Sequence, residues 1–181
     1  MSDPALLERA AALYLQAGHR VAALACYREA GAHLRAADVA LSLGRQATAA
    51  SEYAEAGMPV QAAWLLAVDD PARARAMITG TDLLSRLVLA RCEPGLPLDA
   101  LAAEVCDGLA AAVRTAGEGG ETAPGVAEEW MIALAEQAHR ADLVALVFAA
   151  AVRGRRSGAV VRWQAWAKRV LHTDLIIPDP S

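Results

Sequence analysis

The sequence predicts an all-α protein, an antiparallel helix-pair repeat followed by a small helical C-terminal bundle, and two observations support this fold class. Alanine, the residue with the highest helix propensity, fills 45 of the 181 positions. An internal repeat also runs through the first third of the chain, and such repeats are typical of stacked helical architectures. The repeat is marked by four glycines at intervals of thirteen residues, Gly18, Gly31, Gly44 and Gly57.

The residues around these glycines repeat as well. The fifth residue after each glycine is alanine, and the fourth residue before it is tyrosine in three of the four copies. Thirteen residues do not suit one continuous helix, because successive glycines would lie about 220° apart around its axis. They suit a helix of about ten residues and a turn of about three, with glycine in the left-handed position after each C-terminus. Because such short helices are marginal alone in water, we expect antiparallel pairs, 26 residues per unit, to stack on one another.

The elements of the first part follow from their caps. Asp3 and Pro4 are a cap and a first-turn proline, so the first helix begins there and ends near Ala17. Proline and aspartate signals start the later helices in the same way. We expect these helices at residues 20–30, 33–43 and 46–56. A fifth helix begins at Pro59, a sixth runs from Pro71 to Gly80, and a seventh runs from a cap at Thr81 or Asp82 to Cys92.

The second part begins with a rigid turn at residues 93–97, which contains two prolines and a glycine. A longer helix at 98–116 precedes a glycine-rich stretch, 117–125, that we interpret as a flexible linker. Helices at 126–139, 141–153 and 158–172 and an extended tail at 175–180 complete the chain. The predicted organisation is a repeat array (1–92), a turn and long helix (93–116), the linker (117–125) and a C-terminal helical segment (126–181).

Composition and charge exclude several kinds of partner. The net charge is −4 and the basic residues form no stripe, so we expect no nucleic acid. The longest uncharged apolar run, 143–152, has about half the length needed to cross a membrane, so we expect no membrane. The N-terminus lacks the features of a secretion signal, which predicts a cytoplasmic protein. The abundance of alanine and arginine suggests a bacterial source.

The sequence contains no arrangement of residues that indicates an enzyme, a metal site or a cofactor. Three widely spaced cysteines fit reduced thiols, and no cysteine and histidine pair has the spacing of a zinc half-site. The glycines at 117–120 follow no strand and precede no phosphate-binding lysine. Adjacent acids such as Glu128 and Glu129 point about 100° apart on a helix and do not share a site.

The sequence of the repeat, for example Ala25-Cys26-Tyr27-Arg28-Glu29-Ala30-Gly31, resembles the tetratricopeptide-type repeats and the related repeats of SNAP-like adaptor proteins. The resemblance covers about residues 5–68, with a shortened unit of 26 residues in place of 34. It implies an α-solenoid, in which helix pairs stack into a right-handed superhelix whose concave face binds peptides or helices of partner proteins.

Three groups of residues are candidates for binding. Charged residues on the predicted outer face of the repeats either line a partner groove or form a solvated face. Three arginines in a glycine-flanked loop either bind a phosphate or an acidic partner segment, or belong to a soluble connection. Two tryptophans three residues apart and the apolar tail either pack in a core or form a partner interface. These groups are, in order, Arg20, Arg28, Glu29, Arg35, Arg45, Glu52 and Glu55; Arg153, Arg155 and Arg156; and Trp163, Trp166, Leu175, Ile176 and Ile177.

The function that the sequence favours is a non-enzymatic protein-interaction module, an adaptor or scaffold subunit of a larger bacterial assembly. Its partners would be other proteins or a second copy of the same chain. Two alternatives remain open. One is an all-helical sensor with an alanine-lined cavity for a small apolar ligand, and the other is an accessory subunit of an ATPase-centred system.

Overall fold

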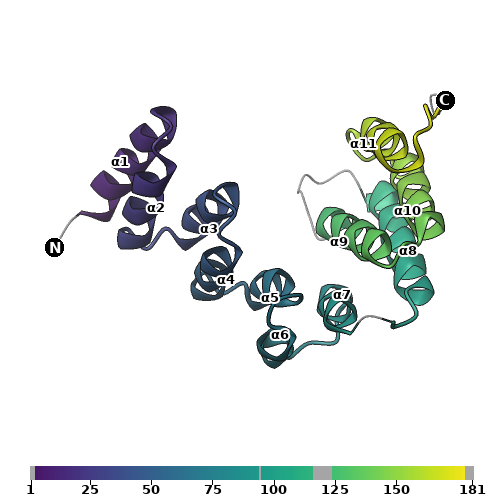
Figure 1. Cartoon of the computed structure of the whole chain (residues 1–181), viewed down its shortest axis with the longest axis horizontal. Helices are drawn as coiled ribbons and strands as arrows, with labels where there is room; N and C mark the ends of the chain where they lie inside the picture. The colour runs from purple at the N-terminus through teal and green to yellow at the C-terminus, as the bar shows by residue number, and fades with distance from the viewer. Residues whose placement is uncertain (1–2, 94, 116–123, 178–181) are drawn as a thin grey trace. The chain divides into compact units, whose positions relative to one another are not determined.

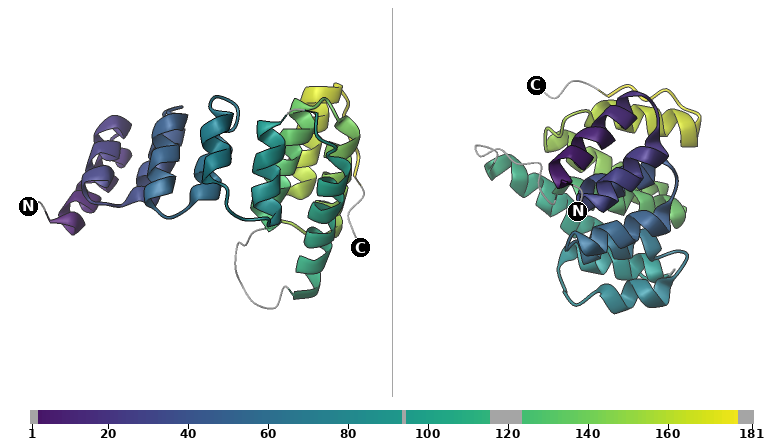
Figure 2. Two further views of the ribbon diagram at one scale, coloured as in Figure 1. Left: turned by 90° about the horizontal axis from the view of Figure 1, so that it is seen from below. Right: turned by 90° about the vertical axis from the view of Figure 1, so that its left-hand side faces the viewer.

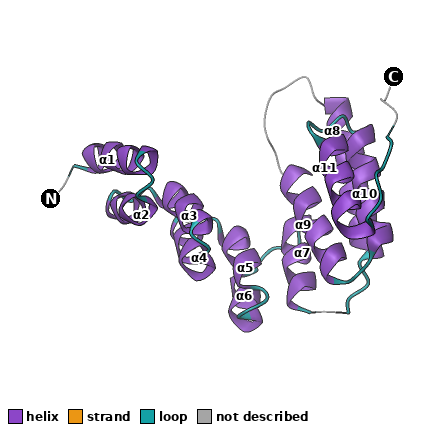
Figure 3. Ribbon diagram, turned by 45° about the horizontal axis from the view of Figure 1, so that its top comes forward, coloured by secondary structure: helices purple, strands orange, loops and turns teal. Residues whose placement is uncertain are grey.

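The computed structural model describes residues 3–93, 95–115 and 124–177, and these residues form eleven α-helices and one π-helix without any strand (Figures 1 and 3). The predicted all-α class is therefore confirmed. The chain divides into two compact units, unit 1 (Met1–Gly80) and unit 2 (Thr81–Ser181). The division lies earlier than the expected boundary at residue 92, because helix α7 (Leu83–Cys92) packs against helices of unit 2. Among the described helices, none is both long enough and apolar enough to span a membrane.

Unit 1 consists of short helices that pack against their neighbours along the chain (Figure 2). Both ends of the first four helices lie within one residue of the predicted positions, and the fifth helix begins at Pro59 as predicted. The sixth ends at Met77 and not at Gly80, because Ile78 adopts an extended conformation, with φ −90° and ψ 114°. Its β-branched side chain lowers the preference of this position for a helix. The helices are α1 (Pro4–Gln16), α2 (Arg20–Glu29), α3 (His33–Ser42), α4 (Gln46–Glu55), α5 (Pro59–Leu66) and α6 (Pro71–Met77).

The thirteen-residue period arises from one turn that occurs four times. Gly31 has a φ of +71°, and the other three glycines lie between +69° and +79°. At the end of α2, the amide of Gly31 donates to the Arg28 carbonyl (3.1 Å) and the amide of Ala32 donates to the Tyr27 carbonyl (2.9 Å). This pair of bonds is the Schellman motif, and equivalent pairs close α1, α3 and α4. The predicted helix ends at the four glycines are therefore confirmed.

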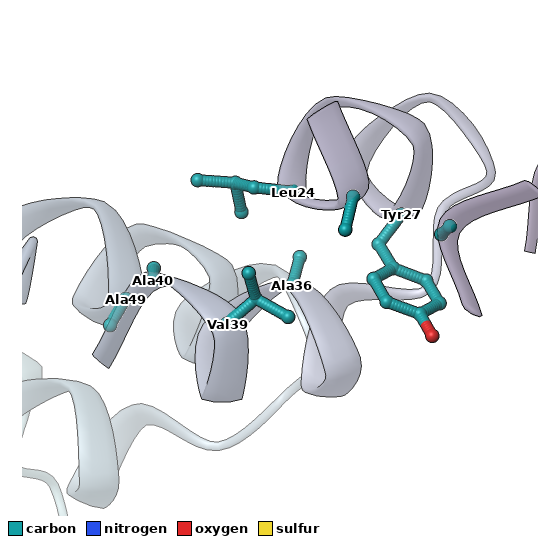
Figure 4. Packing of buried hydrophobic residues seen from close by; sticks show 8 residues of the cluster. Leu24, Tyr27, Ala36, Val39, Ala40 and Ala49 are labelled. Carbon is teal, nitrogen blue, oxygen red and sulfur yellow. The ribbon is translucent and has the colours of Figure 1, made fainter. Parts of the chain in front are cut away.

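The repeated alanines lie in the core of unit 1. Ala23, Ala36 and Ala49, each five residues after a turn glycine, are fully buried. Their small side chains allow close packing, and larger residues such as Leu24 and Tyr27 of α2 fill the remaining space. Figure 4 shows Leu24 and Tyr27 beside Ala36 and Val39 of α3. The core of unit 1 is thus built from repeated positions of the thirteen-residue pattern.

Unit 2 packs α7 against α8 (Asp99–Thr115) and α9 (Pro124–Gln137), and both of these against α10 (Ala141–Arg153). The predicted helix at 158–172 consists of two parts, α11 (Ala159–Trp166) and the π-helix η1 (Ala167–Leu171).

The expected linker, turn and tail are only partly described. Residues 117–123 of the linker, residue 94 of the turn and residues 178–180 of the tail lie outside the described residues. Pro124 and Gly125, which we expected in the linker, belong instead to α9. This start is physically reasonable, because proline has the φ of a helix and its missing N–H costs nothing in the first turn.

Candidate functional site

The charged residues of the repeats form ion pairs within unit 1. Glu52 was expected on a solvated face, but only 3% of it is exposed. Its carboxylate accepts a hydrogen bond from Nε of Arg28 (2.7 Å), and its other oxygen lies 2.9 Å from Nδ1 of His33. These contacts join α2, α3 and α4. Burial of a carboxylate is tolerated here because both oxygens have partners.

In the rest of this charged group, Arg35 also joins two helices, whereas Arg20, Glu29, Arg45 and Glu55 are exposed. Arg35 donates to Glu8 of α1 (2.7 Å), and its guanidinium lies 5.9 Å from the centre of the Tyr27 ring. Arg20 approaches the Ser42 carbonyl (3.5 Å). The ion pairs of Arg35 with Glu8 and of Arg28 with Glu52 thus join helices that are not consecutive in the chain, α1 with α3 and α2 with α4.

A different surface of unit 1, an apolar stripe on α1, was not singled out from the sequence. We define the α1 stripe as Leu6, Ala10, Leu13, Tyr14 and Ala17, residues that share one side of the helix at the spacing of an amphipathic face. Leu6 is 65% exposed and Leu13 is 60% exposed. Twenty-six residues later in α3, the counterparts of Leu13 and Tyr14 are buried. In the sequence, this surface could be recognised only by comparing α1 with the equivalent positions of the thirteen-residue repeat.

The arginine loop between α10 and α11 is held partly by a buried carboxylate that the sequence analysis did not identify. Glu128 of α9 is fully buried and accepts from Nε of Arg156 (3.3 Å) and from the guanidinium of Arg162 in α11. Arg153 and Arg155 are exposed. Arg156 therefore joins the loop to α9.

The two tryptophans lie against α10. The ring of Trp163 stacks nearly parallel to Phe148, with 6.2 Å between the ring centres, and Trp166 packs on the same ring at 6.1 Å. Trp163 is partly buried, and Trp166 is only 4% exposed. In the tail, Gln164 donates to the Leu175 carbonyl (3.2 Å). Leu175 and Ile177 are partly buried.

Ile176 is the tail residue that remains accessible, with 92% of it exposed. The structure thus places the two tryptophans of the third candidate group inside or partly inside unit 2, and presents one large apolar residue of the tail to solvent.

Unit 2 also contains a cavity that we call the Trp166 cavity. It has a volume of about 380 Å³ and lies where the turn between α9 and α10 meets α11 and η1. Trp166 forms part of its wall, and the polar residues around it come from the end of α9, from the turn and from η1. It is lined by Ala135, Glu136, His139, Arg140, Ala141, Val144, Trp166, Arg169 and Val170.

Among the described residues of unit 2, three residues other than glycine have a positive φ: His139 (56°), Arg155 (50°) and His172 (53°). At His139 the turn matches those of unit 1, since the amide of Arg140 donates to the Ala135 carbonyl (2.8 Å) and that of His139 donates to Glu136 (3.0 Å). His139 therefore occupies the place that glycine holds four times in the repeats. Arg155 has the same place after α10. Sequence reasoning missed both turns because it searched for glycine.

Among the described residues, no group of three or more histidine, cysteine or acidic side chains is placed to hold a metal ion. Cys26, Cys92 and Cys106 are not joined by disulfide bonds. Burial raises the pKa of the Cys106 thiol, which disfavours the reactive thiolate.

No protein-family model, curated protein or solved structure matches this chain.

Proposed function

We propose that this chain is a non-enzymatic protein-interaction module in which unit 1 is an α-solenoid-like helical repeat and the α1 stripe is its docking surface. The observation that carries the proposal is the exposure of Leu6 and Leu13. Large apolar side chains gathered on one exposed face are unusual in a soluble monomer and are typical of interaction sites.

The register of the repeat supports a helix as the bound element. In α3, Val39 and Ala40 occupy the places of Leu13 and Tyr14, and they pack against Leu24 and Tyr27 of α2. A surface of the same pattern on α1 is complementary to a helix that presents similar apolar residues. We therefore propose that the partner is an amphipathic helix, which binds by the helix-in-groove mode.

The test is a comparison of two variants that introduce the same charge. Leu13→Glu places a carboxylate in the α1 stripe, and Val161→Glu places one at an equally exposed apolar position of α11. Proteins that co-purify with the unmodified chain and with Val161→Glu, but not with Leu13→Glu, are partners bound through the stripe. Circular dichroism must show equal helical content in both variants.

If Leu13→Glu retains the same co-purifying proteins in the same amounts, the stripe is not the docking surface and the proposal is wrong. A shorter chain that ends before Thr173 separates the contribution of the tail. Loss of the partners on this truncation alone, with unit 1 intact, would assign the interface to Ile176 and its neighbours.

A further inference from the structure

Unit 1 contains its own example of how a surface like the α1 stripe is covered. Positions 26 residues apart are equivalent, because one helix pair of the repeat has that length. All five equivalents of the stripe belong to the core cluster of unit 1 or pack against it, and these residues are Ala32, Ala36, Val39, Ala40 and Leu43. Leu24 and Tyr27 of α2 are the large side chains of the preceding helix pair that pack with them (Figure 4).

A charged residue, Arg9, borders the α1 stripe. It follows Leu6 by three residues and precedes Leu13 by four, spacings that place side chains next to each other on a helix surface. Arg9 is exposed, and it forms no ion pair with any other residue that the structure describes. Asp3, at the start of the helix, is engaged as a cap and accepts from the Ala5 amide (3.0 Å). The edge of the stripe therefore carries an unpaired positive charge.

The equivalent of Arg9 in α3 is Arg35, and this residue is paired. Its guanidinium donates to the Glu8 carboxylate of α1 (2.7 Å) and lies 5.9 Å from the centre of the Tyr27 ring of α2. The helix pair that precedes α3 thus supplies two things, an apolar cover from α2 and a carboxylate from α1. At α1 itself, both the stripe and Arg9 lack this cover.

We propose that the amphipathic helix bound by the α1 stripe belongs to a helix pair similar to α1 and α2. One helix of the partner presents a leucine and an aromatic side chain to the stripe, and the other presents a carboxylate to Arg9. This inference rests on the proposed function of the stripe and adds the chemistry of the partner.

The proposal differs from what the charge of the whole chain suggests. The net charge of −4 favours a basic partner. At physiological ionic strength, exposed charges more than about 8 Å apart are largely screened. Arg9 therefore acts on a docked helix more strongly than the distant acids of the chain do.

The probe is a synthetic peptide of residues 3–32, which contains the sequences of α1 and α2 and carries Glu8, Leu24 and Tyr27. A fluorescent label allows its use at nanomolar concentration, and the full chain is titrated into it while fluorescence anisotropy is measured. We expect saturable binding. Leu13→Gln in the full chain should weaken this binding about tenfold, because the leucine no longer buries its side chain against the peptide.

An exchange of charge between the full chain and the peptide isolates the ion pair. Arg9→Gln in the full chain should weaken binding about threefold, and Arg9→Glu should weaken it about tenfold because it opposes Glu8 of the peptide. Glu8→Arg in the peptide should restore binding to the Arg9→Glu chain. Arg73→Glu, at an exposed arginine of α6, makes the same change in net charge and should leave the affinity unchanged.

Three results would overturn the proposal. The first is the absence of saturable peptide binding up to a millimolar concentration of the chain. The second is equal affinity of the parent, Arg9→Gln and Arg9→Glu chains, as expected if the peptide replaces α1 and α2 on α3. The third is self-association of the chain in sedimentation experiments that Leu13→Gln abolishes, which would assign the stripe to a second copy.

Failure of this inference can be distinguished from failure of the proposed function. The proposed function depends on the loss of co-purifying proteins in Leu13→Glu, a result that does not involve the peptide. If Leu13→Gln weakens peptide binding and the Arg9 variants do not, the stripe remains the docking surface and the carboxylate of the partner is wrong.

Discussion

Replacement of Gly31 by alanine tests the physical basis of the repeat. The added Cβ would meet no atom within 4 Å, so the substitution introduces no collision. The cost arises from the backbone, because the φ of +71° disfavours any side chain. A left-handed residue costs about 1–2 kcal/mol, and alanine recovers about 0.5–1 kcal/mol by restricting the unfolded chain. We therefore expect a net loss of about 1 kcal/mol in the free energy of unfolding.

The measurement is urea unfolding of the full chain followed by circular dichroism, with thermal unfolding as a second readout. For a unit of this size, 1 kcal/mol corresponds to a shift of about 4–8 °C in Tm. Gly158→Ala and Gly108→Ala form a control pair within unit 2. Gly158 has a φ of +69°, whereas Gly108 lies inside α8 without a positive φ, and alanine meets no close atom at either position.

Gly158→Ala should therefore destabilise unit 2, and Gly108→Ala should stabilise it by about 0.5–1 kcal/mol. The reasoning fails if Gly31→Ala is as stable as the parent chain, or if the two substitutions in unit 2 act in the same direction.

Three further expectations concern single residues. Arg155→Gly should stabilise unit 2 by about 0.5–1 kcal/mol, because it relieves the left-handed strain at an exposed position; a lower Tm would contradict this. Glu52→Gln should lower the free energy of unfolding by about 1 kcal/mol, because a neutral side chain weakens the hydrogen bond with Arg28. Glu55→Gln, on the exposed side of the same helix, should leave urea unfolding unchanged. Asp82 caps α7 through Ser85, and the hydrogen bonds from Ser85 lower the pKa of Asp82. A lowered pKa stabilises the fold at pH values above the unfolded pKa, and this contribution is lost as the pH falls through the folded pKa. Asp82→Asn should therefore flatten the decline of Tm below about pH 4, and an unchanged decline would count against the cap.

The sequence was sufficient to predict the helices because their boundaries depend on local signals. Glycine, proline and aspartate fix where each helix begins or ends within a few residues, so the turns at Gly18 and Gly31 followed from spacing alone. Burial depends on distant neighbours and was harder to predict. Glu52 was placed on an exposed face from its residue type, although it lies thirteen residues after Val39, which is buried.

Unit 2 shows why the remaining turns were missed. A glycine near a helix end suggests the left-handed position, but Gly154 has an ordinary φ of −72°, and the next residue, Arg155, is left-handed. Gly154 is required for another reason. A Cβ there would lie 3.1 Å from the Leu109 carbonyl oxygen of α8, a contact between distant parts of the chain that no local pattern indicates. Glu128 was missed for the same reason, because its partners lie 28 and 34 residues away.

The turns of unit 1 have a consequence for the kinetics of folding. The residue after each glycine donates the bond that closes one helix and also stands at the N-cap position of the next, so hardly any chain separates successive helices. Each helix packs chiefly on its neighbours along the chain, and the loops that must close are therefore short. Chains with such local contacts fold within microseconds to milliseconds, because little entropy is lost before contacts form. Unit 1 should accordingly assemble one helix at a time from any point along its length, and α1 should detach without unfolding the other helices.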